Sequence, residues 1–227
     1  MITIIFGSIR VGKTALMTYL STRLALDPSK AARRARKIAE YKARGFHFAD
    51  GSALYADYDI SVDLKHGRGV VQSKVIDPLQ LGDSVFIKPH SVLAVQEAQT
   101  YYSSTGWQRF RAHQAKYFQT SGHYGIDIFL DCQSTNNIVP DIRSIATFIE
   151  VLEGTAYDAA GRPSENVTRK DFSRVVWLIK RYQTERDVIA GRGVKDKIVT
   201  DLNVYAAYDP YSRADDYLPP DPKITII

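Results

Sequence analysis

The residues with the clearest chemical potential stand at the start of the chain, in the pattern Gly-x-x-x-x-Gly-Lys-Thr that runs from Gly7 to Thr14. The glycines allow the backbone to curl so that consecutive N–H groups point inward and surround a phosphate. In such a loop the ammonium of Lys13 reaches the β- and γ-phosphates of a nucleotide, and the hydroxyl of Thr14 binds Mg²⁺. The residues expected to contact the nucleotide are Gly7, Ser8, Ile9, Arg10, Val11, Gly12, Lys13, Thr14 and Ala15.

Apolar residues on both sides of this loop predict the elements that hold it. Residues 2–6 form a short apolar run rich in β-branched side chains, and an apolar helical pattern over residues 14–26 follows directly. A strand, a glycine loop and a helix in this order are the context that a phosphate-binding loop (P-loop) requires. The positive end of the helix adds attraction for the phosphate. The alternative is a glycine-containing turn that matches the pattern by chance.

A second candidate element is the apolar run 92–95, which is followed by Gln96 and Glu97. Four apolar residues and then a polar pair have the shape of a Walker B strand, whose carboxylates order Mg²⁺ and polarise the attacking water. We predict that Glu97 polarises the attacking water and also helps to hold the metal. Gln96 stands at the first acidic position and brings no charge, so Asp131 or Asp59, at other strand ends, would restore a carboxylate near the metal. The alternative is a buried strand with an exposed glutamate.

Further polar candidates follow the next core strand, at residues 126–130. The amide of Gln133 suits a sensor of the γ-phosphate or of the attacking water, and its alternative is an ordinary loop glutamine. Arg143, Arg109 and Arg111 are candidates for an arginine finger supplied to a neighbouring subunit, and the alternative for each is a surface salt bridge. We therefore predict that Lys13, Glu97, Gln133 and Arg143 act in catalysis, and that Thr14 and Glu97 hold the metal.

Strand and helix patterns alternate along the chain. Strands are expected at 2–6, 54–60, 83–87, 91–95, 126–130, 148–152 and 174–182, with short pieces at 70–75 and 202–208; helices are expected at 14–26, 30–44, 107–121 and 139–145. Strands that follow helices, with the phosphate loop after the first strand, predict an α/β P-loop NTPase fold with a mostly parallel central sheet and helices on both faces. Residues 1–208 are expected to form one P-loop ATPase domain and residues 209–227 an irregular C-terminal tail.

Composition limits the class of protein. The chain has 227 residues, of which 44% are hydrophobic and 24% charged, as in a globular protein rather than a disordered one. A single cysteine, Cys132, excludes an internal disulfide and favours a reducing compartment; we expect it to be a small core residue. The five histidines show no spacing typical of metal ligands. No run approaches the length of a transmembrane helix.

Residues 30–44 form a strongly basic helical segment within a chain of net charge +5. One interpretation is a solvated helix face, which is the usual place for a run of charge. The other is a contact with the phosphate backbone of a nucleic acid. Both interpretations remain open at the level of sequence.

Five segments together resemble the zonula-occludens-toxin-like (Zot) proteins, the assembly ATPases of filamentous phages within the FtsK/HerA group of DNA-pumping enzymes. They are 7–14, 92–99, 123–133, 139–143 and 204–209, so the resemblance spans roughly residues 1–210. The P-loop is common to NTPases generally. The segment from His123 to Gln133, followed by Ile-Arg, is the part that narrows the resemblance to this family.

The resemblance implies ATP and Mg²⁺ as cofactors and a ring of identical subunits. It further implies single-stranded viral DNA as a partner, together with other phage assembly proteins and the host inner membrane. The expected location is the host bacterial cytoplasm, at the cytoplasmic face of the inner membrane. The implied function is a motor that hydrolyses ATP to extrude or translocate viral DNA during virion assembly.

Two departures from the family pattern bear on function. Gln96 replaces the family's Asp, which favours an alternative function: a nucleotide-dependent scaffold or binding protein of phage assembly with weak hydrolysis. The family's transmembrane helix, which follows the ATPase domain, is not in this sequence; either the sequence stops short of that helix or the membrane tether lies elsewhere. A small-molecule kinase also shares the P-loop, but the arginine-bearing lid that it needs is not evident in the sequence.

Overall fold

The computed structural model describes residues 1–47, 52–63, 70–106, 110–158, 160–163 and 174–200. The strand expected at 202–208, the tail 209–227, and Arg109 lie outside these residues. The boundary between the expected domain and its tail lies outside them as well. Within the described part of the chain, no helix is both long and apolar enough to cross a membrane.

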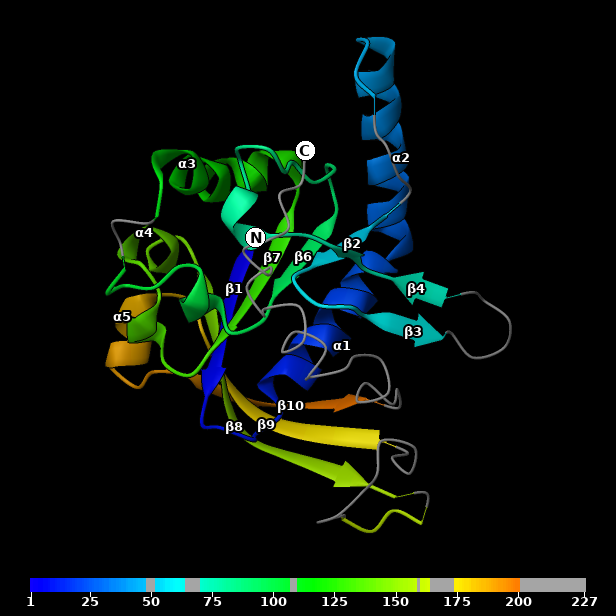
Figure 1. Ribbon diagram of the computed structural model, residues 1–227. Helices are drawn as coiled ribbons and strands as arrows, with labels where there is room; N and C mark the ends of the chain where they lie inside the picture. Colours follow the sequence, from blue (N-terminus) through cyan, green and yellow to red (C-terminus); the bar gives the residue numbers. More distant parts are fainter. Residues whose placement is uncertain (48–51, 64–69, 107–109, 159, 164–173, 201–227) are drawn as a thin grey trace, which may run out of the picture.

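An eight-stranded sheet organises the molecule (Figure 1), in the order β10-β9-β8-β1-β7-β6-β2-β5. The strands β1, β2, β5, β6, β7 and β8 run parallel, whereas β9 and β10 are antiparallel additions at one edge. The predicted α/β fold with a mostly parallel sheet is therefore confirmed. The strand bounds are β1 Ile2–Gly7, β2 Leu54–Ala56, β5 Lys74–Val75, β6 Val92–Val95, β7 Asp127–Cys132, β8 Thr147–Tyr157, β9 Arg174–Tyr182 and β10 Val194–Thr200. A separate hairpin pairs β3 (Ser61–Asp63) with β4 (Val70–Gln72).

Helices cover both faces of this sheet, as Figure 1 shows. On one face lies α1 (Lys13–Ala25); on the other lie α3 (Ala112–Ser121), α4 (Pro140–Arg143) and α5 (Glu185–Ile189). Successive side chains of a strand point to opposite faces, so each central strand contributes to two cores. Ile4 belongs to the core under α3 and α4, and Ile5 to the core under α1. Short 3-10 turns η1 (Pro78–Gln80), η2 (Ala98–Thr100), η4 (Gly122–Tyr124) and η5 (Thr135–Asn137) connect these elements.

The basic segment forms the long helix α2 (Pro28–Ala43), which extends away from the sheet (Figure 1). Asp27 caps its start by accepting a hydrogen bond of 2.8 Å from the Ser29 backbone N–H. Two of its cations anchor the helix to the body: Lys30 pairs with Asp127, and Arg34 donates to the His90 carbonyl at 3.0 Å. The solvated-face interpretation is thus incomplete, because part of the charge serves packing.

Three predicted elements differ from the structure. The strand expected at 54–60 ends at Ala56. The strand expected at 83–87 is wrong: the segment is a turn held by bonds such as Val85 N–H to the Gln80 carbonyl at 3.0 Å, with one isolated bridge between Leu81 and Val85. The helix expected at 107–121 begins at Ala112, and residues 107–109 lie outside the described part. In 83–87 the short apolar run lies in a turn, and its Phe86 side chain is 70% exposed.

Candidate nucleotide-binding site

The P-loop joins the end of β1 to the start of α1 in a backbone conformation that favours glycine. Gly7 has φ 146°, and a Cβ on it would lie 2.5 Å from the Val151 carbonyl oxygen of β8. Gly12 has φ 81° and caps α1, and Arg10 between them is also left-handed at φ 69°. Gly154 of β8 lies under the loop, because a Cβ there would come within 2.4 Å of the Val11 carbonyl. The loop is therefore seated directly on β8.

The first turn of α1 is open toward a ligand. Its cap residue Gly12 offers no side chain to bond the first N–H groups, and the turn contains no acidic residue. These N–H groups have no partner within the helix itself, and with the helix dipole they form an anion site. The Lys13 ammonium folds back onto the Ser8 carbonyl at 2.8 Å. The ammonium therefore lies over the loop.

A cavity of about 250 Å³ lies in front of the loop. Its lining combines the loop with the ends of β6 and β7: Ile9, Arg10, Gly12, Lys13, Thr14, Glu97, Asp131 and Gln133. Of the predicted catalytic residues, the structure therefore brings together Lys13, Glu97 and Gln133. The metal candidates Thr14 and Glu97 share the same cavity.

Asp131 connects the two sides of this cavity. Its Oδ2 accepts a hydrogen bond of 2.6 Å from the Thr14 hydroxyl, and its Oδ1 accepts one of 2.5 Å from the Glu97 backbone N–H. The residue is only 2% exposed. Strand alternation explains its position: Phe129 faces α1, so Asp131, two residues later, faces α1 as well. Of the two carboxylates considered from the sequence, Asp131 is the one beside Thr14, and Asp59 does not line the cavity.

Burial dominates the electrostatics of Asp131 and raises the pKa of its carboxyl to about 6. The hydrogen bonds from Thr14 and from the Glu97 backbone oppose this shift, as does the Lys13 ammonium, while the Glu97 carboxylate adds to it. A buried carboxylate beside a hydroxyl, in a cavity that also holds a lysine, is a site in which a divalent cation would strongly stabilise the charged form.

Glu97 has an unusual backbone conformation for a residue that is not glycine, with φ 47° and ψ 48°. Such conformations cost of order 1–3 kcal/mol and cluster at functional sites. The Asp131 carboxylate fixes the Glu97 backbone, and the Gln99 amide fixes its side chain by donating to Glu97 Oε2 at 2.9 Å. Gln99 was not among the predicted site residues; the signal for it in the sequence is its position two residues after Glu97.

Gln96 does not line the cavity. Its backbone N–H donates to Asp57 Oδ1, at the end of β2, at 2.8 Å. This bond holds the Gln96 backbone toward β2, on the side of β6 away from β7. Since neighbouring strands lie about 4.8 Å apart, Gln96 stands one strand farther from the loop than Asp131 does.

The arginine candidates lie elsewhere on the chain. Arg143, at the end of α4, pairs with Glu185 of α5 at 2.6 Å and donates to Asn136 Oδ1 at 3.2 Å. It does not line the cavity of its own chain, and a role across a subunit boundary stays a prediction. Arg111 is the residue before α3, where its backbone N–H donates to Gln114 Oε1 at 2.9 Å.

Cys132 is buried, and burial raises the pKa of its thiol to about 12, so it is an inert core residue as expected. Among the described residues, no group of three or more His, Cys, Asp or Glu side chains lies together in a way that would hold a metal ion. A metal at this site would therefore rely on few protein ligands and on the ligand's phosphates, which is how proteins usually bind Mg²⁺.

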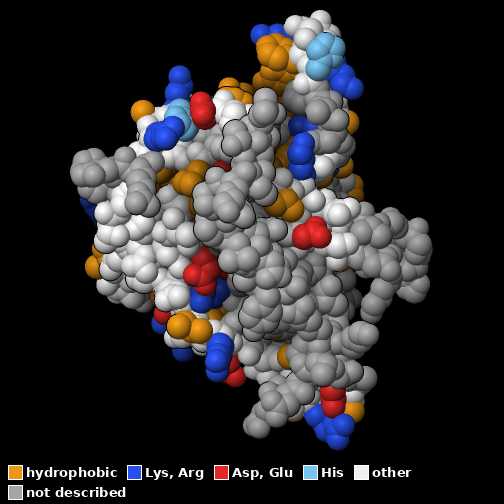
Figure 2. All heavy atoms as spheres, viewed as in Figure 1, with side chains coloured by type: hydrophobic (Ala, Val, Ile, Leu, Met, Phe, Trp, Pro, Cys, Tyr) orange, Lys and Arg blue, Asp and Glu red, His pale blue; other side chains and the backbone are white. Residues whose placement is uncertain are grey.

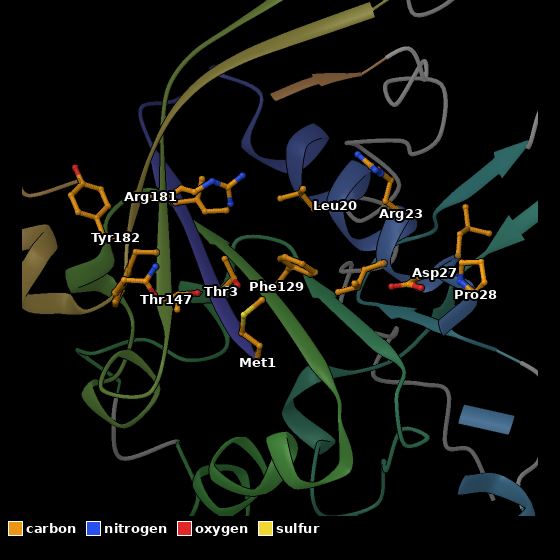
Figure 3. A pocket seen from close by; sticks show the side chains of 15 residues that line it. Met1, Thr3, Leu20, Arg23, Asp27, Pro28, Phe129, Thr147, Arg181 and Tyr182 are labelled. Atoms are coloured by element: carbon orange, nitrogen blue, oxygen red, sulfur yellow. Dashed lines mark hydrogen bonds between the residues drawn. The ribbon is translucent and has the colours of Figure 1, made fainter. Parts of the chain in front are cut away.

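A larger cavity, of about 690 Å³, lies at the opposite end of the sheet (Figure 3). Thr3, Phe129 and Thr147 from the strands face Leu20 and Arg23 from α1 across it. Asp27 is the one carboxylate among its described lining residues, and it is engaged as the cap of α2. This cavity lacks the phosphate-binding backbone of the P-loop and the carboxylates of Glu97 and Asp131. The smaller cavity in front of the P-loop is therefore the candidate nucleotide site, although it is not the larger of the two.

Comparisons with known proteins address the fold. Neither a scan of family profiles nor a sequence search of curated proteins gives a match. A search of solved structures gives the N-terminal domain of zonular occludens toxin from Neisseria meningitidis, with TM-score 0.54 and 13% identity, covering 92% of this chain and 98% of that chain. This chain has the fold of that toxin domain. The resemblance to Zot proteins is thus confirmed at the level of fold.

Other matches are weaker. The genome packaging NTPase B204 from Sulfolobus turreted icosahedral virus 2 matches in complex with sulfate at TM-score 0.40 and 10% identity, covering 86% of this chain and 94% of that chain. The same NTPase in complex with ATP-gammaS matches at TM-score 0.35 and 10% identity, covering 81% of this chain and 97% of that chain. Scores at this level carry no argument about function.

Proposed function

We propose that this protein binds and hydrolyses ATP and uses the energy to move viral DNA during filamentous phage assembly. The observation that carries the nucleotide chemistry is the shared cavity: Lys13 and Thr14 of the P-loop line it together with Glu97 from the end of β6. The fold likeness to the Zot N-terminal domain supports the connection to phage assembly.

Each residue has a definite role in this proposal. The open N–H groups of the loop and of the first turn of α1 hold the phosphates, and Lys13 moves from the Ser8 carbonyl to the β- and γ-phosphates. Glu97 orients and polarises the attacking water as general base. Gln133, exposed at the mouth of the cavity, senses the γ-phosphate with its amide.

The residues present fit Mg²⁺. The Thr14 hydroxyl and the Asp131 carboxylate lie 2.6 Å apart, and hard oxygen atoms of this kind are the ligands that Mg²⁺ prefers. Thr14 would hold the ion directly and the carboxylates would hold its water. When bound, the ion neutralises charge on the phosphates. The chain's own residues then fix the nucleotide's position relative to Glu97.

The wider role remains part of the proposal. A ring of identical subunits, with single-stranded viral DNA as cargo and other phage assembly proteins as partners, follows from the resemblance to Zot proteins. So does a location in the host cytoplasm, at the inner membrane. The exposed part of the basic helix α2 supports contact with an anionic polymer.

The test is ATP turnover measured with and without single-stranded DNA, together with mass measurement in the presence of ATP. Lys13→Ala should abolish turnover and weaken ATP binding, whereas Lys195→Ala, which alters an exposed lysine on β10, should behave as wild type. Wild-type turnover no higher than that of Lys13→Ala would refute the proposal. A monomeric mass with ATP and DNA present would refute the ring.

Gln96 favours a second candidate function, a nucleotide-dependent scaffold with weak hydrolysis. Under this alternative, the missing carboxylate leaves binding intact and slows turnover. Gln96→Asp would then raise turnover strongly, whereas the motor proposal predicts little gain from that change.

A further inference from the structure

We propose that Asp131 supplies the carboxylate that orients the metal in this site, in place of the residue that follows β6. This inference rests on the proposed ATP-binding function. Its basis is the pair of bonds at Asp131: one carboxylate oxygen accepts from the Thr14 hydroxyl at 2.6 Å and the other from the Glu97 N–H at 2.5 Å.

The residue that follows β6 is not suited to supply this carboxylate. Gln96, at the expected position, carries no charge, and its backbone is tied to Asp57 on the side away from β7. Asp131 comes from the strand directly beside β1, where Ile5 and Asp131 are partners in register. The carboxylate has therefore moved from the end of β6 to the end of β7, one strand closer to the P-loop.

Asp131 also positions the general base. Because it holds the Glu97 backbone in its left-handed conformation, one side chain links the metal-binding hydroxyl to the residue that activates water. A role that was only structural would leave the response to Mg²⁺ unchanged, which gives a readout separate from turnover.

The experiment measures binding of a non-hydrolysable ATP analogue with Mg²⁺ and with chelator. Asp131→Asn keeps the size of the side chain; it should leave binding in chelator within a few-fold of wild type and reduce the strengthening by Mg²⁺ by about tenfold or more. Asp57→Asn is the matched control, because the Asp57 carboxylate also accepts a backbone N–H, from Gln96 at 2.8 Å, but lies at the end of β2, two strands from β7.

A second variant protects the test against misfolding. Asp131→Glu keeps a carboxylate at the end of β7 and should retain part of the Mg²⁺ dependence that Asp131→Asn loses. Unchanged Mg²⁺ dependence in Asp131→Asn would overturn the inference, as would an Asp131→Glu variant that folds and responds to Mg²⁺ no better than Asp131→Asn. Failure of the wild type to bind the analogue at all would instead refute the proposed function.

A different surface carries a second inference. Two cavities, of about 550 and 500 Å³, lie on the two sides of Phe86, whose side chain is 70% exposed and lines both. The first is aromatic, with Tyr41, Phe46 and Tyr124 on its walls. The second is polar, with His47 and Lys88 on its walls. We call the two together the Phe86 groove.

The end of α2 forms one wall of this groove. Gly45, at φ 85°, ends the helix in a Schellman motif, in which the Phe46 N–H bonds to the Tyr41 carbonyl at 3.0 Å. This turn places the Phe46 ring against Tyr41 at 5.6 Å, while Lys37 and Arg44 lie over the Tyr41 ring at 5.8 and 5.9 Å. Figure 2 shows hydrophobic, histidine and basic side chains together at the outer end of α2.

The charge along the groove is mostly positive. Its described lining contains two exposed lysines, Lys74 and Lys116, and the buried Lys88, against a single carboxylate, Asp77, which caps η1 by accepting from the Leu79 N–H at 2.9 Å. Exposed aromatic rings provide stacking surfaces for bases, and the lysines attract phosphates. We infer that the Phe86 groove binds single-stranded nucleic acid without regard to sequence. This too rests on the proposed function.

The test is binding of a fluorescent oligothymidine by the whole chain at two salt concentrations. Phe86→Ala should weaken binding about tenfold, and Lys116→Gln should weaken it and reduce its dependence on salt. Ile189→Ala is the control, since Ile189 is an exposed apolar residue on α5. Lys13→Ala should bind oligothymidine as wild type does, which separates this inference from the nucleotide site.

Oligothymidine binding that is equal in Phe86→Ala and wild type would overturn the assignment. If that variant also loses self-association, measured by mass in the absence of DNA, the groove is instead a contact between copies of this chain.

Discussion

The Thr14 hydroxyl donates a hydrogen bond of 2.6 Å to the Asp131 carboxylate, and this bond joins the first turn of α1 to the end of β7. The two residues are 117 positions apart in sequence, and both belong to the cavity that contains Lys13 and Glu97. Around this pair the chain places a phosphate loop, a buried carboxylate and a general base within reach of one ligand.

Glu97→Gln should keep ATP binding close to wild type and lower turnover by about 10²–10⁴-fold, because a glutamine amide cannot take a proton from water. The change preserves size and leaves the backbone bond from the Glu97 N–H to Asp131 intact. Steady-state turnover and equilibrium binding of ATP are the measurements. Glu153→Gln, at an exposed carboxylate of β8, is the control. Equal turnover in Glu97→Gln and wild type would remove Glu97 from the mechanism.

Gly7→Ala should destabilise the protein by about 2 kcal/mol or more, because the backbone has φ 146° and the new Cβ would lie 2.5 Å from the Val151 carbonyl oxygen. Gly45→Ala is the matched control: its φ of 85° is also left-handed, but no atom lies within 4 Å of the added Cβ. Its cost should be only conformational, about 1 kcal/mol. Urea unfolding measures both, and similar losses would show that the contact with β8 does not constrain the loop.

Arg143→Ala and Glu185→Ala should lower stability by similar amounts, about 1 kcal/mol, since the two side chains form one partly buried ion pair at 2.6 Å. Turnover of the folded protein should remain within tenfold of wild type in Glu185→Ala. Thermal unfolding and turnover are measured side by side. A loss of about 10³-fold in turnover that occurs in Arg143→Ala and not in Glu185→Ala would instead support an arginine finger acting on a neighbouring subunit.

His90 should make the protein less stable in mild acid. Burial lowers the pKa of its imidazole, and the nearby cations Lys30, Arg33, Lys37 and Arg34 lower it further. The folded protein therefore favours the neutral ring. This contribution to stability is complete above the ordinary pKa of about 6.5 and is lost as the pH falls below it toward the folded value.

His90→Asn should reduce this loss, because asparagine does not titrate and tolerates the left-handed backbone of φ 56°. Urea unfolding at pH 7 and pH 5 gives the difference in stability for each protein. The exposed His123→Asn serves as control and should keep the wild-type dependence on pH. The same acid sensitivity in His90→Asn and wild type would show that another group is responsible.

Most of the fold could be predicted from local patterns in the sequence. The strand–loop–helix around Gly7–Thr14 has a short-range signature, because glycine spacing and apolar periodicity are properties of adjacent residues. The core strands at 92–95 and 127–132 were likewise visible as buried apolar runs. The turn at 83–87 was mistaken for a strand because Val85, Phe86 and Ile87 are residue types common in strands, whereas pairing with a neighbouring strand depends on contacts distant in sequence.

By itself, the sequence determined that a phosphate loop begins the chain, that a parallel sheet holds it, and that Glu97 and Gln133 end two of the core strands. It left Asp131 and Asp59 as equal candidates for the missing carboxylate. Only the tertiary structure decided between them, because the order of strands in a sheet depends on long-range packing. With β7 placed beside β1, Asp131 meets Thr14, and Gln96 lies one strand away.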